Sequence, residues 1–303
     1  MPPGREPPAP SCEPEGGLTP FKFTLLGAPL DSAAAGEGEE LAPAALRAAG
    51  LVERLGVEDG GDVTARLTDP ARDPASGLIA FAQLVRASRD LRDAVAALDG
   101  RAFVVGGDCS LLPGALAGAR PDDLWMLDGH PDALDGASSP TGEAADMDLA
   151  VITGRGAPEL TGLAGAAPIV APERVALVGH RPASLGADVA EELALVPAGV
   201  HQVLAPEVRA RGGGAVAAEL LGRSAGRRAW LHLDLDVLDA AALPAVSYPQ
   251  PEGLGWEDLH ALLAPLLAAP ELTGVSVADF DAAHPEADAY AERIVAALER
   301  AWP

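Results

Sequence analysis

The chain has 303 residues, 49% of them hydrophobic, and a formal net charge of −24 at pH 7. A chain of this length buries a large core, as one large domain or two smaller ones. Its negative charge repels nucleic acid and anionic membrane surfaces, so the charge argues against both as partners. It suits a soluble protein and, weakly, a small cationic substrate, although a solvated acidic face would explain it equally well.

The first part of the chain, residues 1–19, is dominated by Pro, Gly and Glu and is expected to be a disordered tail. It lacks the apolar stretch of a signal peptide, and no apolar run in the sequence reaches membrane-spanning length. The two cysteines, Cys12 and Cys109, lie far apart, and Cys12 falls in the tail. A structural disulfide is therefore not expected, and the pattern predicts a cytoplasmic protein.

After the tail, short apolar runs alternate with longer segments rich in Ala and Leu. The predicted strands are residues 21–26, 102–105, 124–127, 175–178, 230–235 and 274–277, and the predicted helices are 44–55, 80–98, 184–195, 215–221, 256–267 and 286–301. Alternation of strands and helices indicates a parallel sheet covered on both faces. We predict one α/β domain over residues 20–303, a three-layer αβα structure with a mostly parallel central sheet.

Polar clusters follow four of these strands. They are GGDCS at 106–110, DGHPD at 128–132, DLD at 234–236 and ADFD at 278–281. Ligands of open parallel sheets bind outside the carboxyl ends of the strands. The four acidic strand ends therefore predict one common site.

The segment DGHPD places Asp128, His130 and Asp132 at alternate positions. Alternate residues of an extended chain project to the same side, so these three side chains can converge. Two carboxylates with an imidazole suit Mn²⁺, and Zn²⁺ less well. Taken alone, a polar turn with a helix-capping aspartate explains the pattern equally well.

A second acidic pair, Asp234 and Asp236, lies in the apolar run LHLDLDVLD. Two buried carboxylates at such close spacing need a cation or a proton between them. An exposed edge strand would remove this need, but the flanking Leu and Val residues oppose exposure. Together the two segments predict a two-metal site, with bridging carboxylates and a water that is deprotonated near neutral pH.

These motifs resemble those of the arginase/agmatinase (ureohydrolase) family over nearly the whole chain after the tail. VVGGDCS is similar to the family's Gly-Gly-Asp-His-Ser segment, LDGHPD to Asp-Ala-His-x-Asp, and LDLDVLDAAALPA to Asp-x-Asp-x-x-Asp-Pro-x-x-x-Pro. GVSVADFD resembles the segment that supplies a carboxylate to the substrate guanidinium, and LLGAPLDSAAAGEGEELAPAALRAAGLVERLG the opening strand, loop and helix. The resemblance implies a single α/β domain with two Mn²⁺ that hydrolyses guanidino groups, in a trimer or hexamer.

The resemblance also assigns residues by position. One metal would be held by Cys109, Asp128, Asp132 and Asp234, and the other by Asp128, His130, Asp234 and Asp236. Asp128 and Asp234 would bridge the two ions, which we expect to be Mn²⁺, with Zn²⁺ or Co²⁺ as alternatives. Asp279 would pair with the substrate guanidinium, and Asp132 is placed to pass a proton to the leaving amine.

Four positions depart from the family pattern. Cys109 stands where the family has a metal-binding histidine, and a thiolate there adds negative charge that raises the pKa of a metal-bound water. Ala145, in TGEAADMD, occupies the place of a proton-shuttle histidine, so Glu143 is the substitute considered first, with Asp146 and Asp148 nearby. Asp279 replaces a glutamate, and Ser184 replaces the aspartate with which arginases grip the α-amino group of the substrate.

These departures favour a substrate that is easier to cleave than arginine, such as N-hydroxy-arginine, with release of hydroxyurea or urea and an amine. An alternative hypothesis is a catalytically silent member that acts as a binding or assembly subunit. A cysteine hydrolase using Cys109 with His130 is a third, opposed by the anionic neighbours of the thiol. Phosphate binding at residues 106–107 or 212–214 is excluded because neither stretch has the spacing or the lysine of a P-loop.

Overall fold

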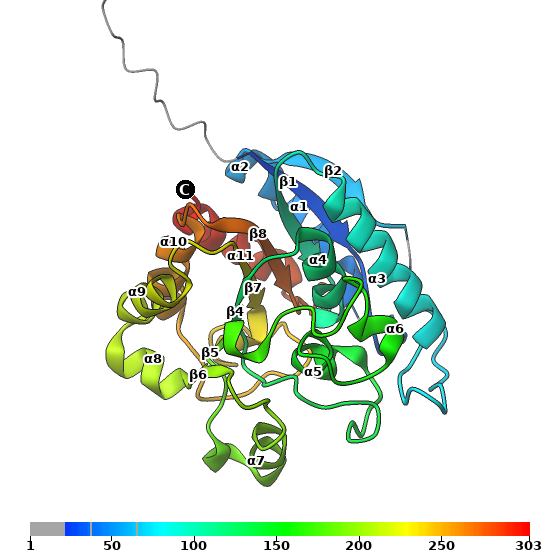
Figure 1. Cartoon of the computed structure of the whole chain (residues 1–303). Coiled ribbons are helices and arrows are strands. Elements are labelled where there is room, and N and C mark those ends of the chain that lie inside the picture. Colours follow the sequence, from blue (N-terminus) through cyan, green and yellow to red (C-terminus); the bar gives the residue numbers. More distant parts are fainter. Residues whose placement is uncertain (1–21, 37, 65) are drawn as a thin grey trace, which may run out of the picture.

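The computed structural model describes residues 22–36, 38–64 and 66–303 of the chain, and its centre is a sheet of eight strands (Figure 1). The strands are β1 Phe23–Ala28, β2 Glu58–Asp62, β3 Arg101–Gly106, β4 Asp123–Leu127, β5 Val175–Val178, β6 His201–Val203, β7 Ala229–Asp234 and β8 Leu272–Ala278. Their order in the sheet is β2-β1-β3-β8-β7-β4-β5-β6, and all of these strand pairs are parallel. The predicted α/β fold is confirmed.

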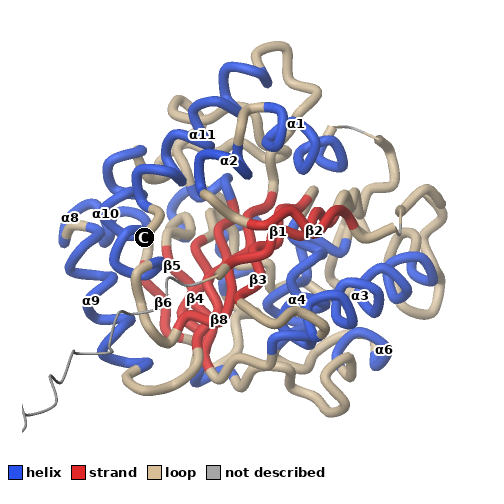
Figure 2. Tube along the Cα trace, turned by 90° about the horizontal axis from the view of Figure 1, so that it is seen from above, coloured by secondary structure: helices blue, strands red, loops and turns tan. Residues whose placement is uncertain are grey.

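Helices cover both faces of the sheet (Figure 2). On one face lie α1 Ala42–Ala48, α2 Leu51–Leu55, α8 Ala205–Arg211, α9 Gly213–Ser224, α10 Trp256–Leu267 and α11 Ala287–Ala301. The opposite face is covered by α3 Phe81–Ala96, α4 Leu112–Ala119, α5 Asp148–Ile152 and α6 Pro158–Thr161. Strand β7 shows the division, because Leu231 and Leu233 belong to the first core and Trp230 to the second. Alternate residues of a strand project to opposite faces, which explains this split.

The central strands were predicted closely, and the differences have local causes. The predicted helix 44–55 is two helices, α1 and α2, because Gly50 between them has a φ of 84° that ends the first. Strand β2 was missed because its sequence, EDGGD, is exposed and has no apolar residue. Strand β6 has only 3 residues at the sheet edge. The predicted disordered tail, residues 1–19, lies outside the described residues.

Further helices were not anticipated, namely α4, α5, α6 and α8. The predicted helix 184–195 is α7 Ala187–Leu193, preceded by a 3₁₀ turn at Ala183–Leu185. In the described part of the chain, no helix is long and apolar enough to cross a membrane.

The four strands that carry the polar clusters, β3, β8, β7 and β4, are consecutive neighbours at the centre of the sheet. Because all of them are parallel, their carboxyl ends lie along one edge. The side chains that follow them are therefore delivered to a single region.

Candidate metal centre

The candidate site is built from the residues that end or follow these four strands. Cys109 opens a 3₁₀ turn, Cys109–Leu111, shortly after β3, and Asp128 immediately follows β4. Asp234 is the last residue of β7, and Asp236 lies in the 3₁₀ turn Leu235–Val237. Asp279 immediately follows β8. The two predicted acidic segments thus face one another across the sheet edge.

The six predicted ligands gather in overlapping groups. Donor atoms of Asp128, His130 and Asp236 lie within 4.8 Å of one another, and Nδ1 of His130 contacts Oδ2 of Asp236. Cys109, Asp128 and Asp234 belong to a second group of the same dimension. Asp132 shares a third with Cys109 and Asp148. Asp128 therefore belongs to the first two groups, as a bridging carboxylate between two ions would.

The carboxylates of the site are deeply buried and mutually repulsive. Burial, followed by the charges of neighbouring aspartates, raises the pKa values of Asp128, Asp132 and Asp234 well above their ordinary range. Oδ2 of Asp128 has no hydrogen-bond partner among the described residues although it is buried. A divalent cation supplies both the missing partner and the missing positive charge. The residues present therefore fit a dimetal group.

Asp236 differs from its neighbours because positive groups lie beside it. Burial raises its pKa, but His130 and then Arg181 outweigh burial and lower the pKa to about 2. Its Oδ1 accepts the backbone N–H of Gly129 at 2.8 Å. A Cβ atom at position 129 would lie 2.6 Å from the carbonyl oxygen of Asp236, so only glycine allows this close approach.

Two of the site aspartates occupy left-handed backbone conformations. Asp132 has a φ of 47° and Asp279 a φ of 65°, which residues with a Cβ rarely adopt. Such strain persists where the surrounding structure enforces it, and it is concentrated at functional sites. Both residues line the cavity that opens above the site.

A cavity of about 530 Å³ opens above these residues. Among its lining residues are eleven carboxylic acids, namely Glu39, Asp108, Asp132, Glu143, Asp146, Asp188, Glu191, Glu192, Asp234, Asp236 and Asp279. No Lys or Arg side chain from the described part of the chain lines it. The cavity reaches α7, which supplies Asp188, Glu191 and Glu192. Its electrostatic character therefore favours a cationic ligand.

The predicted catalytic residues, Asp132, Asp279 and Glu143, all line this cavity. Asp279 is buried beside Glu39, and burial together with that neighbour raises the pKa of Asp279 well above its ordinary value. Glu143 is half-buried and accepts a hydrogen bond from the Tyr248 hydroxyl at 3.1 Å. Ala145 also lines the cavity wall and offers no titratable group.

Cys109 does not pair with His130, as the cysteine-hydrolase hypothesis requires. Its Sγ lies 3.2 Å from Nε2 of His232 and 2.5 Å from Oδ2 of Asp234. Burial and the surrounding aspartates, Asp234 first, raise the pKa of the thiol well above its ordinary value. These surroundings oppose a free nucleophilic thiolate.

Sequence reasoning missed three residues of the site. His232 could have been found, because it precedes Asp234 by two positions on the same strand face. Arg181 is buried, and its guanidinium donates to the carbonyl oxygens of Asp236 at 2.9 Å and Leu238 at 2.9 Å, bracing the loop after β7. Glu39 comes from the turn Glu39–Leu41, and no motif marks it.

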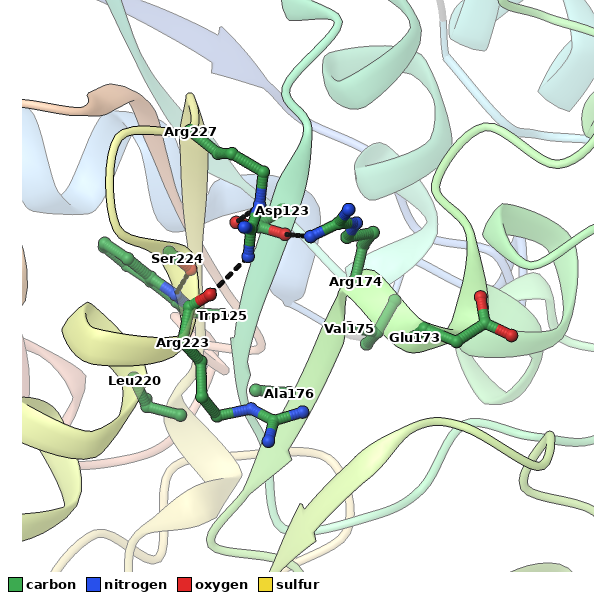
Figure 3. A pocket seen from close by; sticks show the side chains of 10 residues that line it. All are labelled: Asp123, Trp125, Glu173, Arg174, Val175, Ala176, Leu220, Arg223, Ser224 and Arg227. Atoms are coloured by element: carbon green, nitrogen blue, oxygen red, sulfur yellow. Dashed lines mark hydrogen bonds and ion pairs between the residues drawn. The ribbon is translucent and has the colours of Figure 1, made fainter.

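A second cavity, of about 310 Å³, lies at the amino ends of β4 and β5 (Figure 3). Asp123 is buried there and pairs with Arg227 at 2.9 Å and Arg174 at 3.9 Å. This cavity holds none of the predicted site residues and lies at the edge of the sheet opposite the metal-ligand clusters. Asp123 already neutralises part of its positive charge.

Comparisons with known proteins agree on one family. The sequence model described as "Arginase family" matches residues 21–301. The chain is similar to the arginase of Bacillus caldovelox, 30% identical over 267 residues that cover 83% of this chain and 88% of that protein. It is 31% identical to the arginase of Bacillus subtilis (strain 168) over 264 residues, covering 83% and 87%. The crystal structure of arginase from Bacillus cereus superposes with a TM-score of 0.82 at 26% identity, covering 93% of this chain and 98% of that one.

The buried carboxylates predict how the metal-free protein responds to pH. Because the pKa values of Asp128, Asp132 and Asp234 are raised in the folded state, the metal-free folded protein holds more protons above about pH 4 than the unfolded chain does. Its free energy of unfolding should therefore fall as pH rises from about 5 to 8. Urea unfolding after chelator treatment measures this, and saturating Mn²⁺ should flatten the slope. A metal-free protein that becomes more stable over that range would contradict the prediction.

Proposed function

This chain belongs to the arginase family, and from that premise we propose that it cleaves a guanidino C–N bond with two Mn²⁺ held by the six predicted ligands. Family membership makes it a metal-dependent hydrolase of linear amidines. The observation that carries the proposal is the convergence of donor atoms from Cys109, Asp128, His130, Asp132, Asp234 and Asp236 at the base of an acidic cavity. The products would be urea, or hydroxyurea, and an amine.

The six ligands would divide between two ions as the resemblance to the family assigns them, and Asp128 recurs in two of the donor groups of the structure. Cys109, Asp132 and the two bridging residues would hold one ion, and His130, Asp236 and the same bridging residues the other. Asp128 and Asp234 are those bridging residues. Bound there, two divalent ions would act as Lewis acids and lower the pKa of a water molecule between them.

Asp279 would hold the guanidinium of the substrate. Its carboxylate lies within 4.8 Å of donor atoms of Asp234 and Asp236, so a guanidinium bound there lies next to the metal ligands. Glu39 forms a hydrogen bond with Asp279, which requires a shared proton while the site is free of substrate. A guanidinium has five N–H donors and can replace that proton.

Proton transfer would fall to Asp132, which is buried and lies beside the metal ligands. Asp132 would take a proton from the attacking water and deliver it to the leaving amine. Glu143 is then the group nearer the cavity mouth that can exchange protons with solvent, in place of the histidine that Ala145 replaces.

The chemistry of the site favours an activated guanidine. A thiolate at Cys109 makes the attacking group less activated, and Ala145 removes a proton shuttle. An N-hydroxyguanidine has a lower pKa and a more electron-poor carbon than a guanidine, so it is easier to attack. N-hydroxy-arginine is therefore a candidate substrate.

The side of the cavity formed by α7 would contact the other end of the substrate. Asp188 and Glu191 are exposed there, whereas Glu192 lies deeper and accepts the backbone N–H of Ala133 at 3.1 Å. No Lys or Arg side chain among the described lining residues offsets their charge. A substrate carboxylate placed there would be repelled, and a terminal amine would be attracted. The tail of the preferred substrate would therefore carry a positive charge or no charge.

The role of Asp279 can be tested by removing its charge. Asp279→Asn should lower kcat/KM for guanidino substrates by about 10- to 100-fold, because a charge-assisted hydrogen bond contributes about 1.5–3 kcal/mol. Steady-state urea release measures this. Asp279→Glu should retain most of the activity, and Asp93→Asn, an exposed change on α3, should have no effect. An unchanged kcat/KM in Asp279→Asn would remove Asp279 from the site.

The head group of the substrate can be tested with two compounds that share a tail. The manganese-loaded protein should turn over N-hydroxy-arginine faster than arginine, because the carbon of an N-hydroxyguanidine is more electron-poor and needs a less activated nucleophile. Initial rates of ornithine formation under identical conditions measure both. Equal or reversed rates would refute the preference for an activated guanidine, while turnover of either compound would still support the hydrolase.

The tail of the substrate can be tested with two compounds that share a head group. Agmatine lacks the carboxylate of arginine, so the acidic side of the cavity formed by α7 should give it a lower KM than arginine. Raising the ionic strength should narrow the difference, because salt screens the charges of Asp188, Glu191 and Glu192. A lower KM for arginine at low ionic strength would show that the tail contacts another part of the cavity.

A further inference from the structure

His232 has no part in the ligand set proposed above, yet it faces that set from the floor of the site. It lies in β7, is fully buried, and directs Nε2 toward Sγ of Cys109 at 3.2 Å. One ring nitrogen of His232 and donor atoms of Cys109, Asp128 and Asp234 all lie within 4.8 Å of one another. The group combines one sulfur, one nitrogen and two carboxylate oxygens.

We propose that His232 is a metal ligand, and that with Cys109, Asp128 and Asp234 it forms a four-donor position that binds Zn²⁺ in preference to Mn²⁺. The inference rests on the proposed dimetal centre and deepens it, because at the position of Cys109 the side chain of His232 takes the place given to Asp132, which is left to proton transfer. One position of the centre, beside His130 and Asp236, keeps oxygen and nitrogen donors. The other gains a thiolate and an imidazole, so the two positions prefer different ions.

The dimensions of the group suit zinc. Tetrahedral zinc has bonds of about 2.0–2.3 Å to nitrogen, oxygen and sulfur, which places its ligand atoms roughly 3.3–3.8 Å apart. The four donor atoms lie within 4.8 Å of one another, and Sγ of Cys109 is 3.2 Å from Nε2 of His232 and 2.5 Å from Oδ2 of Asp234, so an ion would move Cys109 and Asp234 apart by about 1 Å. Thiolate and imidazole donors favour Zn²⁺, whereas carboxylates favour Mn²⁺.

The orientation of the His232 ring is fixed by a hydrogen bond at Nδ1, the ring nitrogen that does not face Cys109. Nδ1 lies 2.8 Å from Oγ of Ser276, which is directly opposite His232 in the pairing of β7 with β8. The same Oγ accepts the indole N–H of Trp230 at 2.9 Å. A serine oxygen has a second lone pair that can accept Nδ1–H, which leaves the lone pair of Nε2 directed at Cys109. Metal-binding histidines commonly donate their other N–H in this way.

An independent observation points to a ligand in the same place. Oδ2 of Asp128 is buried and has no hydrogen-bond partner in the described part of the chain. Asp128 belongs to the same four-donor group as His232. A core histidine satisfied by Ser276 would account for the ring but not for this carboxylate oxygen. A cation among the four donors accounts for both.

Cys109 and His232 together exchange one imidazole donor for another. Cys109 stands where the resemblance places a metal-binding histidine, so that position loses an imidazole. His232 supplies an imidazole from β7 instead. Strand β8 lies between β7 and β3, the strand that Cys109 follows. The position is therefore rebuilt with different donors rather than lost.

The test compares the full chain with the variant His232→Asn. Asparagine can keep a hydrogen bond to Ser276 through its amide but has no atom in the place of Nε2. Competition with a chromogenic chelator should show that His232→Asn binds the first equivalent of Zn²⁺ more than about 100-fold more weakly, since loss of a supporting residue alone costs 10- to 100-fold. His260→Asn, on α10 and outside the cavity, should bind zinc like the unchanged protein.

A spectroscopic measurement on the unchanged chain guards against a variant that does not fold. The first equivalent of Co²⁺ should produce a thiolate-to-cobalt charge-transfer band and the intense visible bands of four-coordinate cobalt. Cys109→Ser should lose the charge-transfer band. A first equivalent of Co²⁺ with neither feature would overturn the proposal, as would unchanged zinc affinity in a folded His232→Asn.

The two proposals fail in different ways. If the protein hydrolyses guanidino compounds while its first metal shows no thiolate ligand, the zinc position is wrong and the proposed function stands. If the first equivalent of zinc binds through Cys109 and His232 but the loaded protein cleaves no guanidino compound, the proposed function is wrong and the zinc position stands.

Discussion

Buried carboxylates crowded at one edge of the sheet are the constraint on which the rest of this structure depends. Asp128, Asp234 and Asp236 stand at the ends of two adjacent strands, β4 and β7, in the interior of the molecule. Without cations, these carboxylates must bind protons, or their mutual repulsion lowers the free energy of unfolding. Positive charge at this point, which metal ions supply in this family, removes the repulsion without protonation.

The surrounding structure holds the crowded groups in place. Arg181 crosses beneath the site and binds the backbone carbonyls of the loop after β7, so its charge partly offsets the aspartates while its geometry fixes that loop. Gly129 lets the carboxylate of Asp236 approach the backbone after β4. The strained backbones of Asp132 and Asp279 are a further cost that packing must offset. The loop after β7 is thus held by hydrogen bonds from the protein itself.

The sequence predicted the strand ends well because buried parallel strands and acidic strand ends are both local signals. Asp128, His130, Asp234 and Asp236 could be named from spacing alone. Glu39 could not, because it is distant from Asp279 in the sequence and lies beside it only in the folded structure. Arg181 was equally invisible, since its partners are backbone carbonyls that no side-chain pattern records. The edge strand β2 escaped detection because hydrogen bonding to β1, rather than apolar burial, defines it.

The exchange at Cys109 and His232 changes how the altered site should be understood. A thiolate by itself adds negative charge and weakens the pull of the ions on a bound water. Zinc at a position with a thiolate and an imidazole would offset this, because Zn²⁺ binds such donors more strongly than Mn²⁺ and is the stronger Lewis acid. The preference for an activated substrate would then follow less from Cys109 and more from Ala145, which leaves the cavity wall without a proton shuttle at that position. Under these two proposals, metal selection and substrate choice would be separate properties of the site, set by different residues.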